Sequence, residues 1–473
     1  MLSNKTAFAV LLGNRGFFPG SLIAQARDEI SQVLKKLGHK VLMLPVEATR
    51  YGAVETPAEG EVCANFLRQH AKEFDGVILS LPNFGDETGA VAALGEVNVP
   101  IFIHAYPDEF TKMGPETRRD AFCGKFSIMD VFCQNQIKFT ALKPHTVSPS
   151  SKVFAENLDH FDRVCRTVKG VKKMRVGAIG ARTSAFKTVR IDELTLQKYG
   201  ITIETFDLSG ILSDMSKVES SAITKKAQSL QTLSDWSQVP AAAVDRVARL
   251  GVVLDELVEK HKLDAVALRC WLEFQQQAKI SPCAILGQMN ETGLAAACEV
   301  DVGNAILMQA LSLATGHPPA CLDWNNNYGD DENKCILFHC GPVPNSMMTG
   351  KGKIEDHAIL SNAVGKGCSY GCNVGRIRPM PITFGSLATQ DGQINCYIGQ
   401  GEFTADPIPA DFFGCAGVSK IDHLQDVLLH IGRTGHRHHV SVSEGHVTAP
   451  LAEALGSYLG FQVTRMTGND GRG

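Results

Sequence analysis

Short apolar segments alternate with amphipathic helical segments through the first two thirds of the chain, and this alternation limits the fold more than any other feature. At the start of the chain, the pattern predicts strands at 7–12, 40–44, 76–80 and 99–104, with helices at 21–37 and 61–74. Strands separated by helices indicate a parallel sheet covered on both faces. Ligands bind such sheets at the carboxyl ends of the strands.

A second alternation begins near Met174. It predicts strands at 175–179, 201–206 and 264–269, and helices at 192–199, 242–260 and 293–315. Gly177 and Gly180 follow the first of these strands, but the full Gly-x-Gly-x-x-Gly pattern is absent, so we do not predict a dinucleotide site.

The last third of the sequence changes character, because helical periodicity fades after Pro318. Expected strands are 336–340, 382–387, 393–400 and 437–442. We therefore predict two α/β domains, 1–168 and 169–315, followed by a β-rich domain, 316–473.

Composition excludes several classes of protein. The net charge of −4, from 46 basic and 50 acidic residues, gives no basic excess for binding nucleic acid. No apolar run approaches 18 residues, so we expect no membrane span. The first strand begins too early to leave room for a signal peptide, which favours a cytoplasmic protein. The 14 cysteines include no Cys-x-x-Cys pair, so we expect buried, reduced thiols.

Four short segments, 298–301, 321–325, 336–341 and 435–440, hold the acids and histidines of greatest chemical interest. Glu299 has small apolar neighbours and Asp323 stands between Leu322 and Trp324, where a carboxylate is costly unless paired or bound to a metal. Carboxylates combined with imidazoles suit Mn²⁺, Fe²⁺, Co²⁺ or Zn²⁺ better than Ca²⁺. Taken singly, each residue is more often structural, such as an acid near a helix start or a hydrogen-bonded core histidine.

On these residues the chain resembles the L-fucose/L-arabinose isomerase superfamily over nearly its whole length. The resemblance implies two Rossmann-like α/β domains, a barrel-like C-terminal domain and a divalent metal, usually Mn²⁺. It implies that the metal ligands are Glu299 in CEVD, Asp323 in LDW, His339 in LFHCG and His439 at the end of HRHH, with His438 as the rival of His439.

The chain is shorter than a typical L-fucose isomerase, and so looks like the shorter fucose isomerase-like group, which includes enzymes acting on sulfoquinovose. The implied reaction is aldose–ketose interconversion through a cis-enediol, with Glu299 and Asp323 as the acid/base pair and the metal as a Lewis acid. The resemblance also implies a homo-oligomer, with a hexamer favoured, in which Arg15 reaches a neighbouring subunit's site.

Further side chains are candidates for contact with a sugar. Pocket lining is expected from Trp271, Glu273, Trp324 and Asn325, and cations for a sulfonate group from Arg15, Arg182, Lys187, Arg190, Arg376 and Arg378. Ordinary packing or solvent exposure is an alternative for each of them. The same ligands would also serve a metal-dependent hydrolase or lyase, and a non-catalytic sugar-binding protein is a third possibility.

Overall fold

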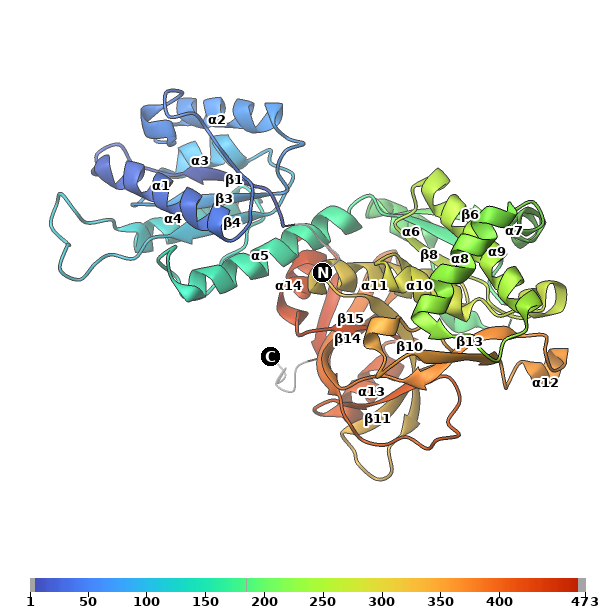
Figure 1. Cartoon of the computed structure of the whole chain (residues 1–473). Coiled ribbons are helices and arrows are strands. Elements are labelled where there is room, and N and C mark those ends of the chain that lie inside the picture. The colour runs from blue at the N-terminus through green and yellow to red at the C-terminus, as the bar shows by residue number, and fades with distance from the viewer. Residues whose placement is uncertain (1–4, 184, 467–473) are drawn as a thin grey trace. The chain divides into compact units, whose positions relative to one another are not determined.

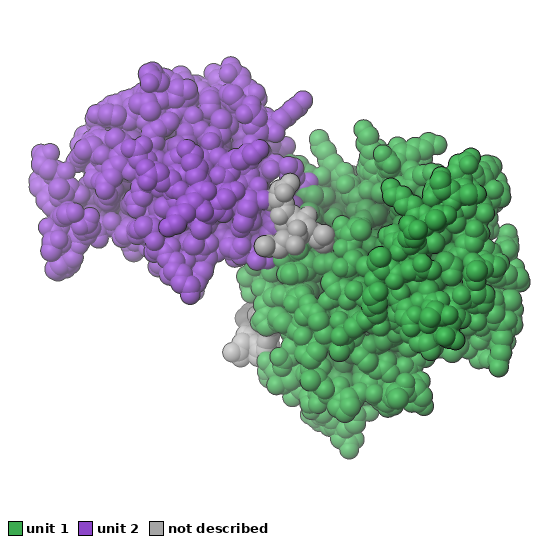
Figure 2. All heavy atoms as spheres, in the orientation of Figure 1, with its two compact units in different colours: residues 1–2, 170–473 green, residues 3–169 purple. Residues whose placement is uncertain are grey.

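The computed structural model describes residues 5–183 and 185–466. These residues fall into two compact units, one within residues 3–169 and the other within 170–473 (Figure 2). The helix α5 (Lys152–Val171) spans the boundary between them. No helix within the described ranges is long and apolar enough to cross a membrane.

The first unit contains a four-stranded parallel sheet in the order β2-β1-β3-β4 (Figure 1). Its strands are β1 (Phe8–Leu12), β2 (Val41–Met43), β3 (Gly76–Leu81) and β4 (Ile101–Ala105). Its helices are α1 (Ser21–Lys36), the short 3-10 helix η1 (Arg50–Gly52), α2 (Pro57–Gln69), α3 (Glu87–Leu94) and α4 (Ala121–Gln134). This arrangement confirms the parallel sheet predicted from the alternating pattern.

The predicted helix at 61–74 is displaced, because α2 begins at Pro57 and ends at Gln69. Thr56 accepts a hydrogen bond from the backbone N–H of Glu59, and Pro57 occupies the first helical turn, where its fixed φ is favourable. Capping by Thr56 and Pro57 therefore sets the start of α2, at a point in the sequence before the apolar pattern begins.

The second unit begins with another four-stranded parallel sheet, in the order β6-β5-β8-β9. Its strands are β5 (Arg175–Ile179), β6 (Thr202–Phe206), β8 (Ala265–Leu268) and β9 (Ala295–Cys298). The accompanying helices are η2 (Lys187–Val189), α6 (Glu193–Lys198), α7 (Leu208–Met215), α8 (Ser220–Leu233), α9 (Ala241–His261), the π-helical η3 (Phe274–Ala278), and α10 (Cys283–Glu291).

The single helix predicted at 293–315 is wrong, since this stretch holds the strand β9 followed by α11 (Val302–Thr315). Alanine favours helices locally, but Ala295–Cys298 is completely buried and pairs in parallel with β8. Pairing within a covered sheet outweighs the helical propensity of the alanines. Glu299 and Val300, both with φ near +60°, separate the strand from the helix.

A ten-stranded mixed sheet follows, in the order β18-β15-β14-β17-β10-β11-β16-β13-β12-β7. The strands are β7 (Ser234–Asp235), β10 (Pro319–Asn327), β11 (Lys334–His339), β12 (Gly352–Asp356), β13 (Tyr370–Arg376), β14 (Met380–Gln390), β15 (Gln393–Phe403), β16 (Cys415–Lys420), β17 (His439–Glu444) and β18 (Gln462–Met466). Because β15 also pairs with β16, part of this sheet closes into a hydrogen-bonded ring. The ring consists of the six strands β15, β14, β17, β10, β11 and β16. The helical segments here are η4 (Asn345–Met347), α12 (Ser361–Val364), α13 (Leu424–Arg433), α14 (Thr448–Ala452) and the π-helical η5 (Glu453–Tyr458).

Helix α11 joins the two sheets of the second unit, and 12 of its 14 residues are buried. One hydrophobic cluster contains its side chains together with Ala267 and Ala297 of the parallel sheet and Leu387 and Ile398 of the mixed sheet. A helix that is apolar all round needs such enclosure. The start of α11, immediately after Glu299, is therefore held firmly against both sheets.

Candidate functional site

The four predicted ligands lie on neighbouring elements of the second unit. Glu299 follows β9, Asp323 lies in β10, His339 ends β11 and His439 begins β17. Strand β10 runs between β11 and β17, and its register sets Asp323 opposite His439 on one side and opposite Phe338, the residue before His339, on the other. Pairing of the strands thus brings together residues that are 140 positions apart in the sequence (439 − 299).

The ligand atoms of these side chains converge on His439. Its Nε2 lies 2.8 Å from Glu299 Oε2 and 3.5 Å from Asp323 Oδ1. The Nε2 atom of His339 lies 3.9 Å from the same Glu299 oxygen. Two overlapping groups therefore have the spacing to hold a metal ion, namely Glu299 with His339 and His439, and Asp323 with His438 and His439.

Burial distinguishes the two adjacent histidines. The side chain of His439 is 1% exposed, whereas that of His438 is 44% exposed and lies 3.7 Å from Asp323 Oδ1. Both rings lie near the same carboxylate, but only His439 also reaches Glu299. The geometry favours His439 as the ligand.

Three atoms of this set, Glu299 Oε2, Asp323 Oδ1 and His339 Nε2, are buried and make no well-aligned hydrogen bond within the described parts of the chain, although Glu299 Oε2 forms the 2.8 Å ion pair with His439. Buried polar groups are normally hydrogen-bonded, and a cluster of unpaired ones calls for an explanation such as a bound ion. Two carboxylates and two imidazoles are a donor set suited to a first-row divalent metal. The residues present therefore fit a divalent metal.

The two acids differ in their electrostatics. Burial raises the pKa of Glu299, but nearby His439 and His339 outweigh it, and the net pKa lies below the usual value. Burial also raises the pKa of Asp323, and there the histidines do not fully compensate, so its pKa stays above the usual value. Burial lowers the pKa of His339 and of His439, but the neighbouring thiols Cys340 and Cys321, together with the acidic neighbours, hold both well above the pKa of free histidine. One site thus contains two carboxyls shifted in opposite directions.

Asp301 is a member of the site that sequence reasoning did not identify. Its fully buried carboxylate accepts a hydrogen bond from Nδ1 of His439 at 2.8 Å and forms an ion pair with buried Arg437. Asn304 donates to it twice, from the backbone N–H at 3.1 Å and from Nδ2 at 2.7 Å. These contacts hold the His439 ring with Nε2 toward Glu299. The one sequence signal that could have identified Asp301 is its position two residues after Glu299.

The backbone at the site is strained. Glu299 and Val300 have φ of 60° and 59°, in the left-handed region that non-glycine residues seldom adopt. A β-branched residue such as Val300 is a clear outlier there, and such conformations cluster at functional sites. Burial of β9 and α11 on either side holds the strained pair in place.

A cavity of about 180 Å³ opens beside these residues, lined by Trp271, Glu299, Asp323 and His339 among others. The indole Nε1 of Trp271 donates to Glu299 Oε1 at 3.1 Å, which leaves Oε2 directed toward the histidines. Trp271 is thus placed where substrate contact was predicted.

A loop after β5 also reaches the site through Phe186, which the sequence did not single out. Its ring packs edge-on against His438, with centroids 5.3 Å apart, and lies 5.6 Å from the His439 ring. The predicted cations Arg182 and Lys187 belong to this loop. Arg182 donates to the carbonyl of Thr183, Lys187 is exposed, and Ser184 lies outside the described residues.

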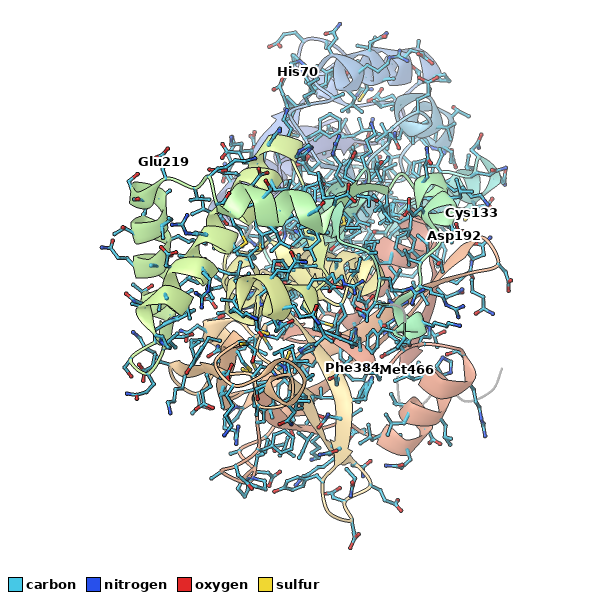
Figure 3. All side chains as sticks on the ribbon, turned by 90° about the vertical axis from the view of Figure 1, so that its right-hand side faces the viewer. His70, Cys133, Asp192, Glu219, Phe384 and Met466 are labelled. Carbon is cyan, nitrogen blue, oxygen red and sulfur yellow. The ribbon has the colours of Figure 1, made fainter. Side chains whose placement is uncertain are left out.

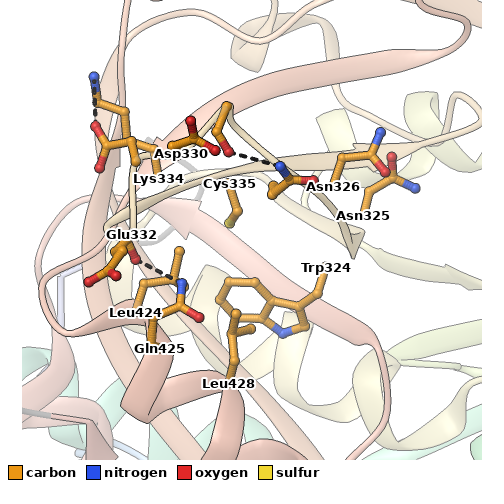
Figure 4. A pocket seen from close by; sticks show the side chains of 13 residues that line it. Trp324, Asn325, Asn326, Asp330, Glu332, Lys334, Cys335, Leu424, Gln425 and Leu428 are labelled. Carbon is orange, nitrogen blue, oxygen red and sulfur yellow. Dashed lines mark hydrogen bonds and ion pairs between the residues drawn. The ribbon is translucent and has the colours of Figure 1, made fainter.

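Other predicted contact residues lie away from the ligand cluster. Glu273 forms a bidentate ion pair with Arg269 at 2.5 and 2.6 Å. Trp324 and Asn325 line a separate pocket of about 420 Å³ (Figure 4). The indole of Trp324 donates to the Tyr397 hydroxyl at 3.2 Å.

The remaining predicted cations already have protein partners. Arg376 donates to the carbonyls of Pro409 and Phe412, and Arg378 forms an ion pair with Glu444. Arg190 donates to the Lys187 carbonyl. In the first unit, Arg15 pairs with Glu87, bonds the Gly85 carbonyl and lies 4.3 Å above the Phe84 ring.

Comparison with known proteins matches each end of the chain to a family of isomerase domains. Residues 9–172 match the family described as fucose/sulfoquinovose isomerase, N-terminal domain, and residues 337–467 match L-fucose isomerase, C-terminal domain. A sulfoquinovose isomerase of Priestia aryabhattai is 22% identical over 394 residues, covering 83% of this chain and 85% of that protein. A sulfoquinovose isomerase of Alkalicoccus urumqiensis is 23% identical over 314 residues, covering 66% of this chain and 70% of that protein.

Proposed function

Since this chain belongs to the fucose isomerase-like superfamily and is an aldose–ketose isomerase, we propose that its substrate is sulfoquinovose or an aldose of the fucose or arabinose type. The product is the corresponding 2-ketose, formed through a cis-enediol. The gathering of Glu299, Asp323 and His339 around the buried ring of His439 carries this proposal. The sulfoquinovose isomerases among the relatives support the sulfonated sugar.

The proposed cofactor is a divalent metal, with Mn²⁺ as the first choice. Glu299, Asp323, His339 and His439 would hold it, and the orphaned polar atoms of the first three support this assignment. When bound there, the ion would act as a Lewis acid toward the oxygens of the sugar.

The proposed acid/base pair is Glu299 and Asp323, whose carboxylates both face the cavity. One removes the carbon-bound proton and the other moves the hydroxyl proton between the two oxygens. Trp271 donates its indole N–H to Oε1 of Glu299 and so fixes the direction of this carboxylate. Trp271 lines this cavity, and Phe186 packs against it with ring centroids 6.0 Å apart.

Recognition of a sulfonate requires cations near the cavity. We assign this part to Arg182 and Lys187, because their loop packs Phe186 against His438. Glu273, Trp324 and Asn325 remain candidates for sugar contact, although their observed partners lie elsewhere.

The three-domain division at 168 and 315, with two Rossmann-like domains and a barrel-like one, is also a proposal, supported by the closed ring of six strands. A homo-oligomer in which Arg15 serves a neighbouring copy, with a hexamer favoured, belongs to the same proposal.

The proposed reaction is tested by offering the Mn²⁺-loaded protein a panel of aldoses and sulfo-aldoses in D₂O. We expect ketose formation from at least one sugar, with deuterium incorporated at C1 or C2. A hydrolase or lyase would show no such exchange between substrate and ketose. No ketose from any sugar of the panel would overturn the proposed substrates.

A further inference from the structure

Two thiols face each other in the wall of the candidate active-site cavity. Cys283 opens α10 and Cys340 follows β11, and their Sγ atoms are 3.7 Å apart. Both residues line the 180 Å³ cavity, so a small solute entering it meets them. Cys340 is partly exposed whereas Cys283 is buried. A disulfide needs an S–S distance of about 2.05 Å, so bond formation requires the sulfurs to approach by less than about 2 Å.

The same pair touches a predicted metal ligand. The backbone N–H of Cys340 donates to Nδ1 of His339 at 2.9 Å, and Cys340 Sγ lies 3.2 Å from the same nitrogen. A histidine that binds a metal through Nε2 carries its proton on Nδ1, and that proton needs an acceptor. In that protonated form Nδ1 no longer accepts from the backbone N–H, and Cys340 Sγ is the acceptor beside it.

Other cysteines of the chain can be compared with the Cys283–Cys340 pair. Cys270 also lines the cavity, and buried Cys298 lies in contact with both Cys270 and Cys340. Cys133 is exposed and belongs to the other unit (Figure 3). Cys283 and Cys298 contact the side chain of Cys340, and the Cys372 thiol contacts its backbone carbonyl. Among these three thiols only Cys283 lines the cavity with Cys340, so the Cys283–Cys340 pair is the one that an oxidant in the cavity can close.

We propose that Cys283 and Cys340 are an oxidisable pair whose disulfide shuts off the site. The oxidant is hydrogen peroxide or a small organic hydroperoxide. The Cys340 sulfur attacks the peroxide O–O bond to give a sulfenic acid, and water or an alcohol leaves. Cys283 then attacks the sulfenic sulfur and releases water. In sum, two thiols and one hydrogen peroxide give one disulfide and two waters. A thiol reductant returns both cysteines to the reduced state.

The consequence for the site follows from geometry. In the disulfide, Cys340 Sγ is drawn toward Cys283, and its 3.2 Å contact with His339 Nδ1 is disturbed. The wall of the cavity is also drawn together where Cys283 and Cys340 line it. This loss of activity rests on the proposed isomerase function, whereas formation of the disulfide does not.

The test treats the reduced, Mn²⁺-loaded protein with a few equivalents of hydrogen peroxide and maps the thiols by mass spectrometry without reduction. Cleavage after Glu291 separates Cys283 from Cys298, and fragmentation of the linked peptide separates Cys335 from Cys340. We expect a Cys283–Cys340 link, at least a tenfold loss of isomerase activity, and recovery with dithiothreitol.

Two variants serve as tests of the pair. For each, the isomerase activity after oxidation is compared with the activity of the same variant before oxidation. Cys283→Ser should give no link and no thiol-reversible loss, whereas Cys133→Ser should respond as the unmodified protein does. A link from Cys340 to Cys298, no link at all, or a reversible loss retained in Cys283→Ser would overturn the proposal. If the protein turns over no sugar, the proposal is still tested by the mapped disulfide link and by the Mn²⁺ affinity measured before and after oxidation.

Discussion

At the scale of single residues, Asp301 shows how the site holds its geometry. A carboxylate with no exposed surface is costly to bury, yet here it bonds one histidine, one arginine and one asparagine. Burial raises its pKa, but the Arg437 charge and the His439 contact outweigh burial and hold that pKa far below the usual value. Asp301 therefore stays ionised and fixes which nitrogen of His439 faces the metal position.

Replacing Asp301 by Asn should weaken metal binding. The amide carries no charge and can turn an N–H toward His439, so the ring loses its orienting partner. We expect Mn²⁺ affinity to fall about 10–100-fold, measured by titration calorimetry on the metal-stripped protein. Asp192→Asn, at the exposed cap of α6, is the matched control and should leave the affinity unchanged. Equal affinities for both variants would contradict this role of Asp301.

The Glu299→Gln substitution tests the acid/base assignment. The amide has nearly the shape of the carboxylate, so the fold should persist, but it cannot take up a proton. Turnover should fall by about 10²–10⁴-fold, the range typical of a lost general acid or base. Initial rates of ketose formation and a circular dichroism spectrum measure the two effects. Near-normal turnover would remove Glu299 from the mechanism.

A buried histidine of the first unit predicts a pH dependence of stability. His104 lies between Ser80 Oγ at 2.9 Å and the Val147 carbonyl at 2.8 Å. Burial, assisted by the Lys125 charge, lowers its pKa to about 4. Because the unfolded value of about 6.5 is higher, protonation favours the unfolded chain. Its stability contribution is present above pH 6.5 and is lost as the pH falls toward 4.

At pH 5 this loss amounts to about 2 kcal/mol relative to pH 7.5. The measurement is urea unfolding of the first unit at both pH values, in the unchanged protein and in His104→Gln. The unchanged protein should lose about 2 kcal/mol more than the variant on acidification. Parallel losses in the two proteins would show that His104 is not the titrating group.

At the scale of elements, the start of α11 explains why the site is rigid. A Cβ added at Gly303 would lie 2.5 Å from the Leu387 carbonyl oxygen and 2.8 Å from Arg437 Nη1. The glycine thus permits the close approach of α11 to β14 and to the arginine that pairs with Asp301. Asp301 and Glu299 both depend on this contact for their positions.

Gly303→Ala should therefore push α11 away from β14, at a cost of about 1–3 kcal/mol in unfolding free energy. Gly432→Ala in α13 is the control, since nothing lies within 4 Å of the added Cβ, and there alanine should be neutral or stabilising. Denaturant unfolding of both variants measures the difference. A Gly303→Ala protein as stable as the control would contradict the packing argument.

The segment before α11 also shows which kind of element cannot be predicted from the sequence. The apolar strands β1, β3, β5 and β8 were predicted nearly to the residue, because continuous burial leaves a continuous apolar run. Strand β9 was missed, since four small residues carry no strand signature and alanine suggests helix. Only the neighbouring strand β8, which is distant in sequence, decides its conformation.

At the scale of the whole molecule, the described residues divide into two units, and the predicted ligands all belong to the one within 170–473. The ligands were predictable only through family resemblance, because no local motif joins Glu299 to His439. The parallel sheets and the β-rich character of the last third followed from patterning alone. The second partners of the histidines, Asp301 and Cys340, could not be predicted, since they depend on strand register and ring orientation.

Metal dependence is the central claim of this account, and one titration tests it most directly. Metal-stripped protein is titrated with Mn²⁺ while bound metal and ketose formation from sulfoquinovose, or from the best sugar of the panel, are measured together. We predict that activity is absent at the start, rises in proportion to bound metal and levels off at one ion per chain. Full activity in protein holding far less than one metal ion per chain would contradict the account.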